Sequence, residues 1–232
     1  MDDQLLTPLS NKQKTVIVTG IVLAILLPFA LTLPIAFSSL NRPDKVLASR
    51  FAFWAEVLLL MLYAAKVEHR KLLMWDEKRI DIVFFLVSVV AMYFLSWACA
   101  LVAAIPRLLG WHENDAVFRK IVQLFVNRQW LMLFTAFTAG VTEELIFRGY
   151  ILTRLSLLIK NRYLPVIISA FLFGAIHFSY RSLREVIFAF LIGIMFGVHY
   201  QKYRNIKVLI AAHFAIDIVN LLIATHFYKL LK

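Results

Sequence analysis

The run TVIVTGIVLAILLPFALTLPIAFSSLN, residues 15–41, contains no charged side chain. A transmembrane helix needs about 20 consecutive, mostly apolar residues, so this run is long enough to cross a bilayer. It is too long for the core of a signal peptide and carries no small-residue cleavage site. We therefore expect it to be retained as a membrane-spanning helix that is kinked at Pro28 and Pro34.

The composition of the whole chain agrees with a membrane protein. Of its 232 residues, 62% are hydrophobic and 17% are charged, whereas a soluble domain is about half apolar and a quarter charged. Because a folded soluble domain leaves a large surface in water, this composition excludes disordered and secreted soluble proteins. The single cysteine, Cys99, also excludes an internal disulfide and a cysteine-cluster metal site.

Further uncharged or nearly uncharged stretches extend this pattern along the chain. They predict an all-α fold, a polytopic transmembrane helix bundle of about seven spans, within a range of six to eight. After the first span, the others are expected at residues 50–66, 81–107, 130–157, 163–180, 186–201 and 208–228. In the sixth of these spans, Gly193-x-x-x-Gly197 predicts a close helix–helix contact.

One amphipathic segment separates the third span from the fourth. Asn114 or Asp115 could cap a helix there, and the apolar side chains fall on one face of that helix, namely Phe118, Ile121, Val122 and Phe125. Such a pattern is typical of an interfacial helix that lies on the membrane.

The net charge of +11 comes from 25 Lys and Arg against 14 Asp and Glu. The basic residues fall in short segments between apolar runs, so membrane lipids with anionic head groups are the expected partner. No basic stretch is interleaved with aromatic residues, and we therefore expect no nucleic-acid binding. Basic residues divide almost evenly between the loops of the two sides, which leaves the orientation open.

Charged groups at membrane depth are costly and mark a functional site by default. The fourth span contains Glu143, Glu144 and Arg148. Helix residues four apart share a face, whereas adjacent residues point about 100° apart. Glu144 is therefore expected to pair with Arg148, which leaves Glu143 without a local partner and makes it the candidate general base. The alternative is that all three residues mark an interfacial helix end.

Two histidines in other spans add to this cluster. His177 lies near the end of the fifth span, where a lone histidine is more often a satisfied interface residue. His213 and Asp217 are a stronger signal, because their spacing of four places both on one face inside the seventh span, and Asn220 joins that face. Carboxylates and histidines on three helices suggest a polar cavity that admits water. The chemistry they suit is hydrolysis, with Glu143 taking a proton from water and a histidine holding that water.

The same groups could instead bind a divalent metal ion, most readily zinc, which would itself activate water. Its ligands would then be Glu143, His177, His213 and Asp217, although the usual His-Glu-x-x-His pattern is absent. Glu56 in the second span has no role in either scheme. A buried pair with a basic residue is the simplest expectation for it.

These motifs resemble the CPBP family, which contains the CAAX proteases and the bacteriocin-processing enzymes and is also called the Abi family. Glu143-Glu144-Leu-Ile-Phe-Arg148, Phe173-x-x-x-His177 and His213-x-x-x-Asp217 follow its pattern EExxxR, FxxxH and HxxxN/D in order. The resemblance covers roughly residues 130–225. It implies variable transmembrane helices and the interfacial helix at 1–129, followed by a catalytic helix core at 130–232.

The resemblance also implies an activity, that of an intramembrane endopeptidase with a cavity open to membrane and water. Glu143 would activate the water, His177 would help to position it, and His213 with Asp217 would form the oxyanion site. In the prenyl-protein endopeptidases of the family the last position is Asn, a hydrogen-bond donor, whereas Asp217 donates only when protonated. This departure puts the oxyanion role in doubt, moves it to His213 and Asn220, or favours a metal.

Other classes of function stay open at this stage. The substrate could be a lipidated C-terminal tail, a bacteriocin leader peptide or a C-terminal sorting tail with a transmembrane segment. A proton- or ion-coupled transporter could use the same polar residues, but it predicts inverted repeats or paired broken helices, which the sequence lacks. A non-catalytic membrane immunity or interaction protein is a third class. A bacterial cell membrane, the inner membrane, is the expected location, and the endoplasmic reticulum is the alternative.

Overall fold

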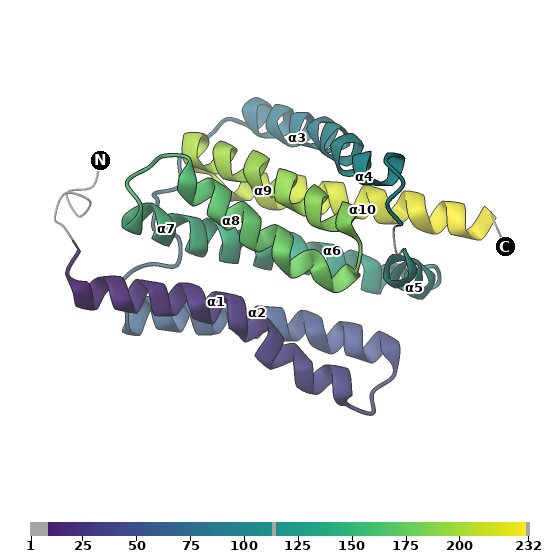
Figure 1. Cartoon of the computed structure of the whole chain (residues 1–232), viewed down its shortest axis with the longest axis horizontal. Helices are drawn as coiled ribbons and strands as arrows, with labels where there is room; N and C mark the ends of the chain where they lie inside the picture. Colours follow the sequence, from purple (N-terminus) through teal and green to yellow (C-terminus); the bar gives the residue numbers. More distant parts are fainter. Residues whose placement is uncertain (1–8, 113–114, 231–232) are drawn as a thin grey trace.

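The structure is a computed structural model that describes residues 9–112 and 115–230, and most of this part is helical (Figure 1). The elements in chain order are α1 (Asn11–Phe37), α2 (Arg42–Lys66), α3 (Ile82–Ala103), α4 (Ile105–Leu108), α5 (Ala116–Phe125), α6 (Gln129–Glu144), a π-helical segment (Leu145–Leu152), α7 (Thr153–Leu158), α8 (Leu164–Ile176), a 3-10 turn (His177–Tyr180), α9 (Leu183–Tyr203) and α10 (Ile206–Leu230). No strand occurs within these described ranges.

Six helical stretches in the described part are long and apolar enough to cross a membrane, and a shorter apolar helix covers Leu164–Tyr180. This confirms the expected polytopic, all-α bundle of about seven spans. The second span begins earlier than expected, because Asn41 accepts a hydrogen bond from the backbone N–H of Asp44 and Pro43 occupies the first turn of α2. Arg50 is therefore inside α2, not at its edge.

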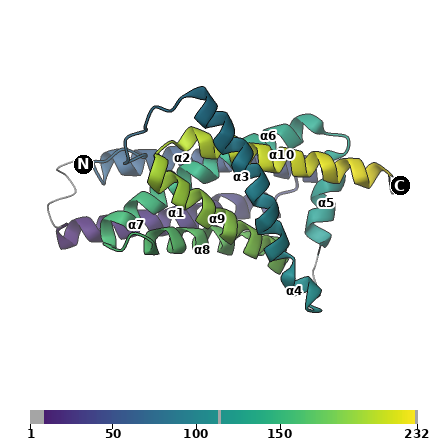
Figure 2. The same ribbon diagram turned by 90° about the horizontal axis from the view of Figure 1, so that it is seen from above.

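The helices are arranged around a core formed by α6, α8, α9 and α10 (Figures 1 and 2). The α1–α2 hairpin lies on one side of this core and contacts it chiefly through α2 against α6, while α3 lies on the opposite side against α9 and α10. Pro28 and Pro34 lie inside α1, which changes direction part-way along its length in Figure 1.

Small residues bring the core helices close together. A Cβ added at Gly193 would lie 2.8 Å from the Cα of Ala170, and one at Gly197 would lie 2.8 Å from Val166, so both glycines of the GxxxG motif face α8. This confirms the close contact predicted for the motif. Gly140 does the same between α6 and α10, where an added Cβ would lie 3.2 Å from the carbonyl oxygen of Ile210 and 3.2 Å from the amide nitrogen of Phe214.

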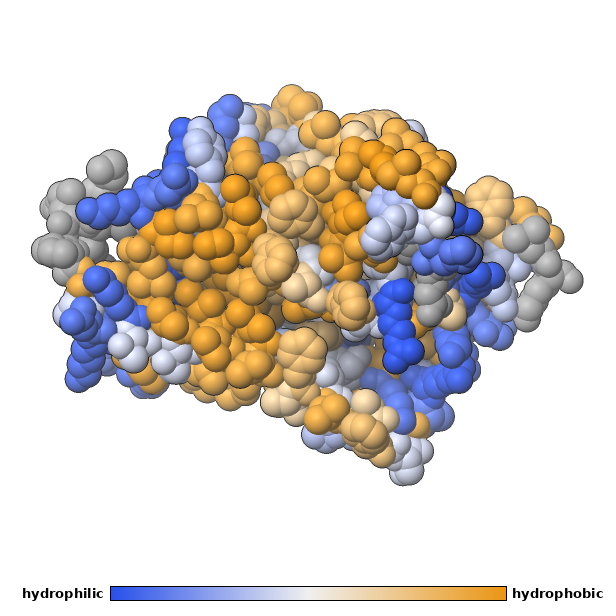
Figure 3. Space-filling view, in the orientation of Figure 1, coloured by the Kyte–Doolittle hydropathy of each residue, from blue (hydrophilic) through white to orange (hydrophobic). Residues whose placement is uncertain are grey.

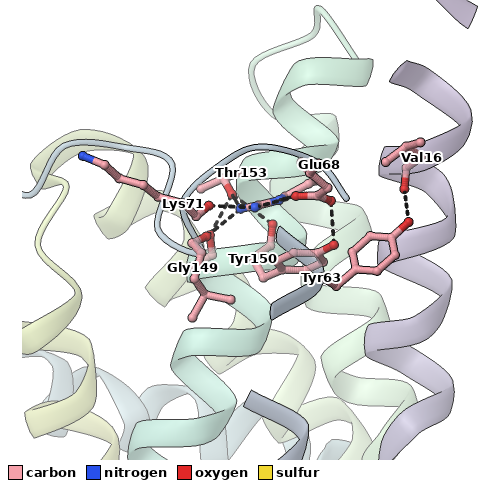
Figure 4. A network of polar contacts seen from close by, with 9 residues as sticks. Val16, Tyr63, Glu68, Lys71, Gly149, Tyr150 and Thr153 are labelled. Carbon is pink, nitrogen blue, oxygen red and sulfur yellow. Dashed lines mark hydrogen bonds and ion pairs between the residues drawn. The ribbon is translucent and has the colours of Figure 1, made fainter. Parts of the chain in front are cut away.

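A buried polar network connects the loop after α2 to the core (Figure 4). Arg154 donates to Glu68 at 2.7 Å and to the backbone carbonyl of Lys71 at 2.8 Å. Tyr150 donates its hydroxyl hydrogen to the other oxygen of Glu68 at 2.7 Å. Because Arg154 is fully buried and ion-paired, this network satisfies a charge at depth and fixes the loop against the π-helical segment.

The surface and the crosswise helix α5 fit a membrane setting. In Figure 3, hydrophobic side chains cover the middle of the visible face, and hydrophilic ones gather towards its two ends. Figure 2 shows α5 crossing the direction of α10 near one end of the bundle, with Val122 and Phe125 buried. Asp115 occupies the N-cap position of α5 without a capping hydrogen bond from its side chain, and Asn114 lies outside the described residues.

Candidate active site

The first motif lies where α6 passes into the π-helical segment. α6 ends at Glu144, and residues 145–152 follow with the wider π-helical winding. Such segments are rare and occur often at functional sites. The expected ion pair is present across this junction, with Arg148 Nη1 2.7 Å from Glu144 Oε1. Glu144 is fully buried and Arg148 nearly so, so each neutralises a charge that the interior would otherwise hold alone.

The same oxygen of Glu144 also binds His213, on α10. His213 Nδ1 lies 2.8 Å from Glu144 Oε1. An ionised carboxylate only accepts hydrogen bonds, so Nδ1 carries the ring proton and donates it. This contact fixes both the orientation of the imidazole and its tautomer, and it leaves Nε2 to face the carboxylates described next. Glu144 thus supports a histidine as well as Arg148, a role that the i,i+4 spacing within its own helix did not reveal.

His213 Nε2 lies between two further carboxylates. It is 3.9 Å from Glu143 Oε2 and 3.7 Å from Asp217 Oδ2. Both separations exceed a direct hydrogen bond, and both leave space for a bridging water. The Glu143 and Asp217 side chains keep 17% and 34% of their surface exposed, compared with 0% for Glu144. Glu143 and Asp217 are therefore accessible, whereas Glu144 is a buried support.

His177 begins the 3-10 turn that follows α8. Its Nδ1 lies 2.8 Å from the carbonyl oxygen of Phe173. A carbonyl oxygen only accepts, so Nδ1 carries the proton and Nε2 is left with its lone pair. Phe173 is buried, packs against the His177 ring at 4.8 Å, and also lies under the Arg148 guanidinium at 4.5 Å. The second motif thus holds Arg148 and His177 through one aromatic ring.

All of these accessible groups meet at one cavity of about 380 Å³, which we call the site cavity. Its wall contains the four candidate catalytic residues together with Phe173 and Asn220. It also contains apolar side chains of α5, namely Phe118, Ile121 and Phe125. The three motifs, which lie on different helices between residues 143 and 217, therefore meet at this cavity.

A second cavity of about 400 Å³, the hairpin cavity, lies between the α1–α2 hairpin and the core. Glu143, His177 and Tyr180 line both cavities, so the two adjoin at the candidate catalytic groups. Most of the hairpin cavity's wall is apolar, and it includes Pro28 at the bend of α1. Glu56 also lines it. The side chain of Glu56 is fully buried, and neither carboxylate oxygen has a hydrogen-bond partner among the described residues, so the expected pair with a basic residue is absent there.

A divalent metal ion would need at least three of these side chains around one point. Within residues 9–112 and 115–230, no group of three or more His, Cys, Asp or Glu side chains is arranged to hold one. In both histidines the engaged nitrogen is Nδ1, which bonds to Glu144 in His213 and to the carbonyl oxygen of Phe173 in His177. Nε2 is left for another partner, an arrangement that histidines also adopt when they bind a metal. The mechanism proposed below uses side chains and water alone.

The sequence did not predict two residues of the cavity wall, Arg50 and Tyr180. In the sequence, Arg50 marks the start of the second expected span and Tyr180 the end of the fifth. In the structure Arg50 and Tyr180 line both cavities, and the Tyr180 ring stacks on that of His177 at 5.9 Å. The i,i+3 spacing of His177 and Tyr180 was the available signal for the second residue.

Comparison with protein families supports this site. Residues 125–219 match the family described as type II CAAX prenyl endopeptidase Rce1-like. This part of the chain is Rce1-like. The match spans all three motifs and confirms the resemblance to the CPBP family. Comparisons with curated proteins and with solved structures give no match.

The Rce1-like match and the fold together support a coarse assignment. The family is one of proteases that act in membranes, and six apolar helices of the described part can span one. The chain is therefore an integral, multi-pass membrane protein, and its residues 125–219 are similar to a family of endopeptidases, whose substrates are proteins or peptides. The division at residues 129 and 130 stays a prediction, although the matched segment begins close to it.

Proposed function

We propose that the chain is an intramembrane endopeptidase that hydrolyses a peptide bond in a membrane-associated protein, with Glu143 activating the attacking water. The observation that carries the proposal is the 3.9 Å separation between Glu143 Oε2 and His213 Nε2 in the wall of the site cavity. One water can bond to both groups across that separation. A carboxylate beside such a water is placed to act as its general base.

The first step joins the water to the substrate. The water oxygen attacks the carbonyl carbon of the scissile bond while Glu143 takes one of the water's protons. His177 Nε2 can accept a hydrogen bond from the second hydrogen of the water, because the proton of the ring is on Nδ1 and is donated to the carbonyl of Phe173. When the tetrahedral intermediate collapses, the C–N bond breaks and Glu143 passes its proton to the leaving amine. The products are one new carboxyl terminus and one new amino terminus.

The oxyanion of the intermediate needs hydrogen-bond donors. His213 donates from Nε2 when its ring carries both protons, since Nδ1–H remains bonded to Glu144. Asp217, 3.7 Å from the same nitrogen, balances the charge of that ring. Asn220 lines the site cavity, and its amide adds a second donor. This assignment gives Asp217 a role that does not require it to be protonated.

The substrate is proposed to be a lipidated C-terminal tail, a leader peptide or a C-terminal sorting tail with a transmembrane segment. The apolar hairpin cavity beside Glu143 supports the first and the third, because each of them carries an apolar anchor near the bond to be cut. A bacterial cell membrane is the location we propose, and membrane fractionation of the source cells tests it.

The proposal is tested with purified protein in nanodiscs and one peptide of each substrate type, with products identified by mass spectrometry. Wild type is expected to cut at least one peptide at a single bond. Glu143→Gln should lower the rate by about 10²- to 10⁴-fold, the usual contribution of a general base. Its fold should persist, because Glu143 appears in no side-chain hydrogen bond described by the structure.

Glu185→Gln is the matched control. It makes the same change at another carboxylate of the cavity wall, one that pairs with Arg184 at 3.0 Å. Its rate should stay within a few-fold of wild type. Cleavage by Glu143→Gln at the wild-type rate would overturn the role of Glu143, and failure of the wild-type protein to cut any of the peptides would overturn the protease assignment.

A further inference from the structure

Arg50 occupies an unusual position for a charged residue of a membrane helix. It lies eight residues after the start of α2, about 12 Å along the helix axis. Its side chain lines both the site cavity and the hairpin cavity, beside Glu143 and His177. The guanidinium is thus placed where the two cavities adjoin the proposed catalytic water.

The other deep arginines of the structure are neutralised by a carboxylate at short distance. Arg148 lies 2.7 Å from Glu144, and Arg154 lies 2.7 Å from Glu68. Arg50 has no ion pair with any of the described residues. Its contacts are long hydrogen bonds of 3.3 and 3.4 Å to the neighbouring Ser49 hydroxyl, and a position 4.7 Å over the Phe53 ring.

The nearby carboxylates act on Arg50 at longer range, but none of those in the described residues forms a short ion pair with it. Glu143 and Asp217 line the site cavity with Arg50 but have their nearest ionisable contact at His213. Glu56 lines the hairpin cavity, yet its two oxygens have no hydrogen-bond partner among the described residues. A guanidinium at membrane depth is stabilised most by a counter-charge that it contacts directly. Its complement by charge and shape is a planar carboxylate, which it binds through two parallel hydrogen bonds.

We propose that Arg50 binds a carboxylate of the substrate peptide and so fixes the register of the scissile bond against Glu143. The inference rests on the proposed function, since it takes the peptide to occupy the site cavity. The carboxylate has two possible sources, the free C-terminus of the peptide and an Asp or Glu side chain near the cut. Arg50 is then a specificity-determining residue that touches substrate without joining the proton transfers.

Binding and cleavage are measured separately, so that this inference and the proposed function can fail independently. Binding uses the Glu143→Gln protein in nanodiscs of phosphatidylcholine, which carry no net charge. The probes are three fluorescent versions of one lipid-anchored peptide: a free C-terminal acid, the C-terminal amide, and the amide with one Asp near its end. The peptide cut in the assay above is used, or the C-terminal tail peptide if none is cut.

The Glu143→Gln protein that keeps Arg50 should bind one of the two carboxylate-bearing peptides more tightly than the plain amide. The difference in Kd should be at least about 10-fold, as expected for a charge-assisted pair. The preferred version identifies the source of the carboxylate. Arg50→Gln should reduce that preference to about one while leaving affinity for the amide unchanged. Arg50→Lys keeps the charge but loses the two-pronged geometry, and should retain part of the preference. Arg42→Gln, at the exposed start of α2, is the control and should retain all of it.

Equal binding of the three peptides by the Arg50 protein, including no binding of any of them, would overturn the inference. So would a preference that survives in Arg50→Gln. If Arg50→Gln does not fold, Arg50→Lys serves in its place. A preference in Arg50→Lys as large as that of the protein with Arg50 would then overturn the inference. Arg50-dependent binding without cleavage by the wild-type enzyme would instead leave the carboxylate site standing and remove the protease assignment.

Discussion

Glu144→Gln is the substitution that separates the buried support from the proposed base. Glu144 Oε1 accepts from Arg148 at 2.7 Å and from His213 at 2.8 Å, and the side chain is fully buried. The amide keeps the size and one acceptor oxygen but removes the negative charge. The change therefore perturbs charge at one point without opening a cavity.

The expected loss of stability follows from Arg148. Its guanidinium would remain buried without a charge partner, and breaking a buried ion pair from one side costs about 3–5 kcal/mol. The Arg148 guanidinium also lies over the rings of Phe173 at 4.5 Å and Phe196 at 5.3 Å. Because the substitution does not change these contacts, they do not offset the lost stability. Because the amide oxygen still accepts one hydrogen bond, we expect the lower end, about 3 kcal/mol. For a chain of this size that lowers Tm by roughly 6–12 °C.

The same substitution should also lower the rate, because His213 loses the carboxylate that fixes its tautomer and orientation. Loss of such a support typically costs a factor on the order of 10³ in kcat. Thermal unfolding in detergent and turnover of a cleaved peptide are measured on the same preparation, with Glu143→Gln beside it. Glu143→Gln should lose turnover at an unchanged Tm. A Glu144→Gln protein with wild-type Tm and turnover would refute the reasoning.

Three further predictions follow from the same geometry. Asp217→Asn should lower activity by up to about tenfold in the peptide assay, since the amide keeps the shape and adds a donor but removes the charge that balances the His213 ring; complete loss would show that no donor can replace this charge. Gly140→Leu should lower both Tm and turnover, because any side chain there meets the backbone of α10 at 3.2 Å and would move Glu143 away from His213; wild-type values for both would contradict this contact. Prolonged dialysis against a chelator should leave the cleavage rate unchanged, whereas loss of activity that zinc restores would place a metal in the mechanism.

The sequence predicted the spans and the convergence of the motifs because these features depend on simple periodicities. Apolar length gives the helices, and a spacing of four gives the Glu144–Arg148 and His213–Asp217 pairs within single helices. The GxxxG contact followed from the same kind of local reasoning.

The remaining features depend on how distant helices pack, which no local pattern contains. The hydrogen bond between Glu144 and His213 joins residues 69 positions apart. The position of Arg50 in the cavity wall depends on where α2 begins and on how the α1–α2 hairpin lies against the core. The unpaired state of Glu56 among the described residues likewise follows from tertiary contacts, since a basic partner was the simplest expectation from the sequence.

The central claim is that Glu143 activates water directly and does not itself attack the substrate. It is tested most directly by one turnover of excess enzyme on a cleaved peptide in ¹⁸O-water, followed by mass spectrometry of both product and enzyme. The account predicts one ¹⁸O atom in the new carboxyl terminus of the product and none in the enzyme fragment that contains Glu143. Incorporation of ¹⁸O into the Glu143 carboxylate would indicate a covalent acyl intermediate and would contradict the account.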